Sequence, residues 1–174
     1  YIDAGYDVVY TCTSCGLCLL HDYQGILEIP EAKKIAENSF DLYEYVLKLI
    51  TEREIKPNFR EVNRVLAYHI PCHLRALKIG YPAADVIKLI PGLQCRILDD
   101  ACCGLNGSYG FKKINEATAV QLGRRAVSLI QKTGAEAIVA DCGSCRMQLS
   151  GLSGMDAFDP VEIICESLGI KGKK

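Results

Sequence analysis

The sequence lacks several features that would assign it to a common functional class. No apolar run approaches the roughly 20 residues needed to cross a bilayer. The formal net charge is only −1, which argues against nucleic acid as the main partner. There is no G-x-G-x-x-G motif, no P-loop and no Ser-His-Asp arrangement. The chain begins at Tyr1 with neither a signal peptide nor an initiator methionine, so we expect it to be a piece of a longer protein.

Cysteine, in contrast, is abundant. The 174 residues include ten cysteines, and 49% of the chain is hydrophobic, which is enough for a packed core without disulfide bonds. Most of the cysteines lie in Cys-x-x-Cys or Cys-Cys clusters. Such clusters are typical of thiolate ligands in a reducing compartment rather than of a disulfide framework. We therefore predict a metal-binding protein of the cytoplasm.

Five of these cysteines form one spaced pattern, Cys…Cys-Cys-Gly…Cys-x-x-Cys. The two adjacent thiols cannot easily bond to each other, but both can point at one ion or cluster if the backbone turns sharply. Gly104 directly follows the pair and allows such a turn. We interpret all five as ligands of one site: Cys72, Cys102, Cys103, Cys142 and Cys145.

Strand and helix patterns alternate from residue 64 onwards. The runs 65–70, 94–98 and 137–140 are predicted strands, and each leads directly into one of the cysteine groups. Helices are predicted between them, over 82–90 and 115–133. This alternation indicates an α/β fold with a small parallel sheet flanked by helices. Ligands bind beyond the carboxyl ends of such strands, so the five thiols are expected at one edge of the sheet.

An earlier segment repeats the last part of this pattern. A β-prone run at 7–10 precedes Cys12 and Cys15, just as 137–140 precedes the second Cys-x-x-Cys. We interpret residues 1–28 as the end of a first copy of the domain. Residues 29–61 are then a helical linker, with a second helix starting near Ser39, and 62–174 form a complete second domain.

Cys12 and Cys15 are therefore further candidate metal ligands, half of a site whose other thiols lie outside this chain. Cys18 and His21 leave open a local four-ligand site instead. That alternative requires one helix to wrap four side chains around a single ion. The half-site is the interpretation we favour.

Thiolates select zinc, Cu(I) or iron–sulfur clusters. A structural zinc ion needs four ligands, and a cubane [4Fe-4S] cluster also needs four cysteines. Five converging thiols exceed both requirements. The surplus favours a larger or less regular cluster, or a cluster beside which one thiol stays free for chemistry.

The complete motif resembles the signature of the cysteine-rich CCG domain. That family includes one subunit of heterodisulfide reductase, one subunit of anaerobic glycerol-3-phosphate dehydrogenase, and lactate-utilisation iron–sulfur proteins. The segments 68–73, 102–113 and 141–142 resemble the glycerol-3-phosphate dehydrogenase subunit most. The resemblance implies a Rossmann-like fold, two such domains in the whole protein, and a [4Fe-4S] cluster, non-cubane in type, held by the five cysteines. It also implies that zinc replaces the cluster in some copies.

Three functions are consistent with these features. The first is an iron–sulfur electron-transfer subunit that relays electrons between a flavoprotein dehydrogenase or other redox subunit and a quinone or another carrier. The second is a catalytic reductase subunit that cleaves a thiol/disulfide substrate at the cluster. The third is a structural zinc module. Whether the chain alone is an enzyme stays open, and contact with the inner face of the membrane is expected only through partners.

The remaining candidates have simpler roles. His73 is expected to donate a hydrogen bond to cluster sulfur, or else to be satisfied by nearby backbone, and Gly104 to support the ligands from behind. His69 is predicted to be structural. Cys95 and Cys165 are predicted to be small buried apolar residues. The basic tail, residues 171–174, is expected to have no fixed structure.

Overall fold

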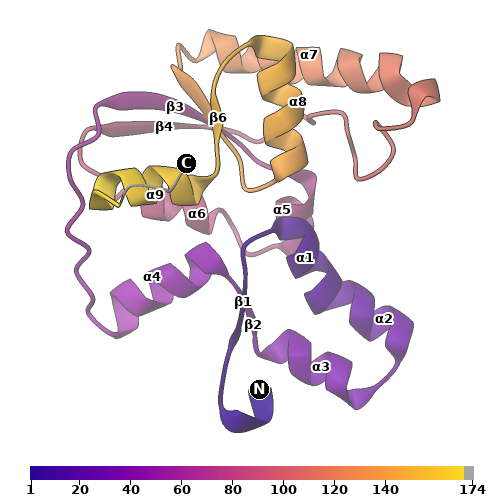
Figure 1. Ribbon diagram of the computed structural model, residues 1–174, viewed down its shortest axis with the longest axis vertical. Helices are drawn as coiled ribbons and strands as arrows, with labels where there is room; N and C mark the ends of the chain where they lie inside the picture. Colours follow the sequence, from indigo (N-terminus) through magenta and orange to yellow (C-terminus); the bar gives the residue numbers. More distant parts are fainter. Residues whose placement is uncertain (171–174) are drawn as a thin grey trace.

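Four parallel strands form the main sheet, in the order β4-β3-β5-β6 (Figure 1). The structure is a computed structural model that describes residues 1–170. The central pair is β3 beside β5, where Leu66 pairs with Ala137. The strands span Arg64–His69 in β3, Leu93–Leu98 in β4, Ala137–Val139 in β5 and Ala157–Phe158 in β6.

Helices cover both faces of this sheet, as Figure 1 shows. Side chains alternate along a strand, so Leu66 and Tyr68 of β3 enter one core while Ala67 enters the other. The first core packs against α4, α6 and α9, and the second against α7 and α8. These helices span Leu42–Glu52 in α4, Pro82–Ile87 in α6, Glu116–Lys132 in α7, Gly143–Ser153 in α8 and Pro160–Leu168 in α9.

The N-terminal part of the chain contains a second, two-stranded parallel sheet, which lies apart from the main sheet in Figure 1. Its strands β1 and β2 pair Val8 with Ser39. An irregular helical run follows β1 and returns through α3 to β2. The elements are η1 (Ile2–Ala4), β1 (Val8–Tyr10), α1 (Thr13–Leu17), η2 (Cys18–Asp22), α2 (Tyr23–Leu27), α3 (Pro30–Glu37) and β2 (Ser39–Asp41).

The predicted fold class is confirmed, because the sheets are parallel and helices flank them. One boundary was wrong: Ser39 starts a strand and not a helix. The helix begins at Leu42 because the Asp41 carboxylate accepts the backbone N–H groups of Tyr43 and Glu44 and so caps its first turn. Residues 29–61 are thus helix, strand and helix. The short strand β6 and helix α5 (Cys72–Leu77) were also not predicted.

The order of the strands creates a specific place for a ligand. From β3 the chain passes through α5 and α6 to β4 on one side, then through η3 (Lys113–Asn115) and α7 to β5 on the other side. The connections therefore diverge between β3 and β5, and a parallel sheet binds ligands at the carboxyl end of such a point. Within residues 1–170, no helix has the length and apolar character to span a membrane. The expectation for the basic tail concerns residues outside this range.

Candidate metal centre

Three loops carry the five predicted ligands to the carboxyl edge of the sheet. Cys72 is the first residue of α5, directly after β3. Cys102 and Cys103 follow β4. Cys142 is the N-cap of α8, directly after β5, and Cys145 lies in the first turn of that helix. The loops after β3 and β5 thus meet where the connections of the sheet diverge.

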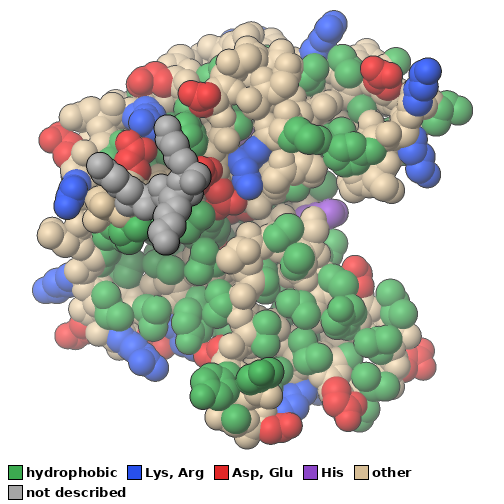
Figure 2. Space-filling model, in the orientation of Figure 1, with side chains coloured by type: hydrophobic (Ala, Val, Ile, Leu, Met, Phe, Trp, Pro, Cys, Tyr) green, Lys and Arg blue, Asp and Glu red, His purple; other side chains and the backbone are tan. Residues whose placement is uncertain are grey.

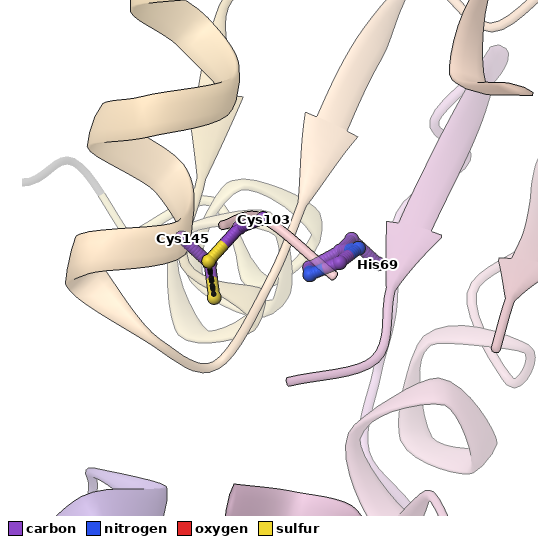
Figure 3. A group of neighbouring side chains, drawn as sticks. All are labelled: His69, Cys103 and Cys145. Atoms are coloured by element: carbon purple, nitrogen blue, oxygen red, sulfur yellow. Dashed lines mark hydrogen bonds between the residues drawn. The ribbon is translucent and has the colours of Figure 1, made fainter. Parts of the chain in front are cut away.

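The sulfur atoms of Cys103 and Cys145 lie 3.1 Å apart (Figure 3). Both of these residues are buried, and so is Cys142. Cys102 is half-buried and Cys72 is exposed. All ten cysteines lie in the described range and are free thiols. Among the five predicted ligands, burial therefore differs: Cys103, Cys142 and Cys145 are enclosed, whereas Cys72 faces solvent.

The inner thiols are arranged as two thiolates around one thiol. A hydrogen bond from Cys145 is the main cause that lowers the pKa of Cys103 to about 4, and it likewise lowers the pKa of Cys142 to about 5. The same two hydrogen bonds and burial raise the pKa of Cys145. Ser144 and the backbone at the start of α8 also stabilise the Cys142 thiolate. Two of the three inner sulfurs are thus already in the form that binds metal.

The pKa of Cys72 responds to three of the other four predicted ligands. Burial against the protein raises its pKa, and the charges of Cys102, Cys103 and Cys142 raise it further. Several thiolates at one place repel one another unless a cation joins them. The arrangement therefore favours a multiply charged metal centre.

Gly104 fixes the turn after the adjacent pair. Its φ is 93°, and a Cβ atom at this position would overlap the carbonyl oxygen of Ala119 in α7. Its backbone N–H donates to the sulfur of Cys102 at 3.3 Å. A glycine is thus required both for the backbone conformation and for the close approach of α7. Gly104 thus lies next to the sulfur of Cys102.

Arg75 joins the first two loops. Its guanidinium donates to the carbonyl oxygens of Ile70 at 3.2 Å and Ala101 at 3.1 Å. The same group forms an ion pair with Asp99 at 2.9 Å. The residues before Cys72 and before Cys102 are therefore held together by one side chain.

His69, which the sequence predicts to be structural, lies beside the buried sulfur atoms. It ends β3 with 1% of its surface exposed, and its ring contributes a nitrogen atom within 4.8 Å of the sulfurs of Cys103 and Cys145. The nearby ring also helps to lower the pKa of Cys103. In Figure 3 one ring nitrogen is directed toward the two sulfurs. The available signal was its place at the last position of the strand that leads into Cys72.

The N-terminal candidates lie beside the site. Helix α1, with Cys12 at its N-cap, packs against α5, and the Ser14 hydroxyl is 2.7 Å from Nδ1 of His73. Cys15 is close enough to Cys12 and Cys18 for their charges to raise its pKa. His73 thus bonds to a side chain of the N-terminal segment, an option that neither expectation for it included.

Two cysteines lie away from the five. Cys95 of β4 packs against the first core, and burial raises its pKa to about 11. Cys165 is half-buried in α9. Cys95 keeps its proton at neutral pH, which fits the predicted role as a small apolar residue.

These observations define the class of protein: an α/β domain with a thiol-rich site at the carboxyl edge of its parallel sheet. Residues 66–150 match the family model of the cysteine-rich CCG domain, and this confirms the family that the motif predicted. The matched region contains all five thiols of the pattern. This part of the chain therefore belongs to the CCG cysteine-rich domain family.

Individual relatives match over most of the chain. It is 26% identical over 164 residues to a subunit of anaerobic glycerol-3-phosphate dehydrogenase from Escherichia coli K12, covering 94% of this chain and 41% of that protein. It is 27% identical to a subunit of dihydromethanophenazine:CoB–CoM heterodisulfide reductase from Methanosarcina barkeri, with coverages of 94% and 41%. An uncharacterized iron-sulfur protein of Methanocaldococcus jannaschii is 25% identical, with coverages of 82% and 26%. The chain thus spans at most about two fifths of these relatives.

Proposed function

We propose that this chain is an iron–sulfur electron-transfer part of an oxidoreductase complex. The observation that carries the proposal is that the loops bearing the five cysteines all follow strands of one parallel sheet, and that two of these cysteines have strongly lowered pKa values. The names of the relatives support it, since two are subunits of redox enzymes and one is an iron-sulfur protein.

The residues present fit such a group. Soft thiolate donors select iron–sulfur clusters and zinc over hard cations. The inner sulfurs are buried, and the backbone N–H of Gly104 already donates to one of the outer ones. When bound, an iron–sulfur cluster supplies one-electron redox chemistry. The ligands in the proposal are Cys72, Cys102, Cys103, Cys142 and Cys145, and the surplus over four favours a non-cubane [4Fe-4S] cluster, with zinc as a substitute.

The proposal extends to domains and partners. Exposed apolar side chains gather over the N-terminal segment in the lower half of Figure 2. Such a surface fits the proposal that residues 1–28 end a first CCG domain, whose remainder covers them and completes the site of Cys12 and Cys15. A flavoprotein dehydrogenase or other redox subunit is the proposed electron donor or acceptor, in a reducing compartment such as the cytoplasm. The exposed residues are Tyr1, Tyr6, Tyr23, Ile26, Leu27 and Ile29.

A second function, a thiol/disulfide reductase, is favoured by one observation. Cys72 is exposed while its inner neighbours are buried, so a disulfide substrate can reach this sulfur first. A raised pKa keeps Cys72 a poorer nucleophile in the metal-free protein, so a bound centre is needed to activate it. Spectral changes of the loaded protein on addition of a thiol or disulfide distinguish this function from simple electron transfer.

Metal analysis of protein prepared without air tests the main proposal. We expect iron and acid-labile sulfide in stoichiometric amounts and a reversible, paramagnetic redox transition. The Cys103→Ser variant should lose most of the iron, while Cys165→Ser, a cysteine outside the site, should retain it. Stoichiometric zinc without iron would select the structural zinc module, and protein without either metal would refute the proposal.

A further inference from the structure

The tightest group of metal-binding side chains within residues 1–170 is not made of thiols alone. His69, Cys103 and Cys145 are all buried, and their donor atoms lie within 4.8 Å of one another. They come from three different elements: the end of β3, the loop after β4 and the first turn of α8. The imidazole thus lies inside the site and not at its rim (Figure 3).

The ring of His69 lacks the contacts of a structural histidine. A buried histidine with only a packing role satisfies its nitrogens with backbone or side-chain oxygen atoms. Nδ1 of His69 has no hydrogen-bond partner among the described residues, and a ring nitrogen lies within 4.8 Å of the sulfur of Cys103. Packing alone would be better served by an apolar side chain, since an unpartnered buried nitrogen is costly.

The strand geometry also directs the ring into the site. Ala67 packs in the core on the α7 and α8 side, and His69 shares that face because side chains alternate along β3. Tyr68 points to the opposite core, where its hydroxyl donates to Asp141 at 2.5 Å. The register of β3 therefore holds the imidazole beside Cys103 and Cys145.

We propose that the imidazole of His69 is a metal ligand of this centre, beside Cys103 and Cys145. The inference rests on the proposed function, because it requires that the thiol cluster binds a metal. A tetrahedral site with metal–donor distances of about 2.0–2.3 Å keeps its donors within about 4 Å of one another, close to the spacing of this group. Imidazole nitrogen binds both zinc and iron alongside thiolates. One neutral nitrogen in a set of thiolates leaves the centre less negative and raises its reduction potential.

Nitrogen hyperfine spectroscopy of the full chain tests this directly. The chain is reconstituted anaerobically with iron and sulfide, or loaded with Co²⁺ as a probe if it holds zinc, with natural or ¹⁵N-labelled histidine. We expect a strongly coupled nitrogen that changes with the label. The His69→Gln variant should lose this signal and bind Co²⁺ at least about tenfold more weakly. The matched control His73→Gln, four positions further on the same segment, should keep it.

A second variant distinguishes loss of the metal ligand from loss of the fold. His69→Cys offers a sulfur donor at the same position, so it should keep the metal content, lose the nitrogen signal and, with iron, lower the reduction potential. A loaded wild-type protein with only weakly coupled nitrogen would overturn the assignment, because His69 would then only donate a hydrogen bond to Cys103. That result leaves the five-thiol proposal intact, whereas wild-type protein that binds no metal at all refutes the proposed function.

Discussion

Among single residues, the glycine after the adjacent cysteines determines where their sulfur atoms lie. Gly104 combines a left-handed backbone with contact to α7, and its N–H reaches the sulfur of Cys102. The nearby Gly107 has a similar backbone, with φ of 60°, but a Cβ there would meet nothing within 4 Å. An added Cβ would therefore cause backbone strain alone at Gly107, but both backbone strain and a steric collision at Gly104.

Gly104→Ala should therefore destabilise the protein more than Gly107→Ala. At Gly107 only the left-handed conformation is penalised, by about 1 kcal/mol. At Gly104 the same penalty is joined by a collision with the Ala119 carbonyl, so we expect a loss of about 3 kcal/mol or more. Urea unfolding of the metal-free protein measures both values. Equal losses for the two variants would mean that the approach of α7 imposes no constraint.

The sequence predicted the thiols but not the histidine beside them. Cysteines in a spaced motif after predicted strands indicate a shared site, because few other roles require that pattern. A lone histidine inside an apolar strand carries no comparable signal. Its role depends on which face of β3 it occupies, and that face is decided by how β4 and β5 pair with β3.

Among the elements, helix α4 is capped at its start by a buried carboxylate, that of Asp41. Asp41 accepts the N–H groups of Tyr43 and Glu44, yet burial raises its pKa to about 6. The folded protein therefore holds a proton on Asp41 more tightly than the unfolded chain does. The stability that this proton contributes is full below about pH 4 and is lost as the pH rises through about 6.

Asp41→Asn should thus stabilise the protein at neutral pH. Asparagine is an equally good N-cap but carries no charge to bury. We expect the variant to exceed the wild type by about 1–3 kcal/mol at pH 8 and to lose this advantage near pH 4. Unfolding free energies across this pH range provide the measurement. Asp41→Ala, which removes the cap, should be less favourable than Asp41→Asn at every pH by about 1 kcal/mol; a pH-independent gain for asparagine would contradict the assignment.

The longer strands and helices were predicted best, because each is long enough to show its own period. Helix α7 and strand β3 were predicted nearly to their ends. Strands β2 and β6 were missed, because neither contains the β-branched residues that mark the equally short strands β1 and β5. Short elements of this kind are set by tertiary contacts that no local pattern records.

In the molecule as a whole, a bound metal should act as a cross-link between loops. The ligands follow three separate strands, so they come together only in the folded state. A metal at one hundred times its dissociation constant stabilises the folded protein by about 2.7 kcal/mol. We expect this to raise the unfolding temperature by at least about 5 °C.

Calorimetry of the loaded and metal-free protein checks this shift. Chelation should return the unfolding temperature to the metal-free value, and Cys103→Ser should show little response to added metal. An unchanged unfolding temperature after stoichiometric loading would mean that the metal binds the unfolded chain equally well, and so does not join the three loops.

The parallel pairing of β3 with β5 also determines when, during synthesis of the chain, the site can form. Leu66 can meet Ala137 only after residue 137 has been synthesised, and the last two predicted ligands, Cys142 and Cys145, lie further on still. A nascent chain that ends before residue 142 offers this site only three of its five predicted thiols, those of Cys72 and the adjacent pair. We therefore expect metal insertion to follow the synthesis and pairing of β5.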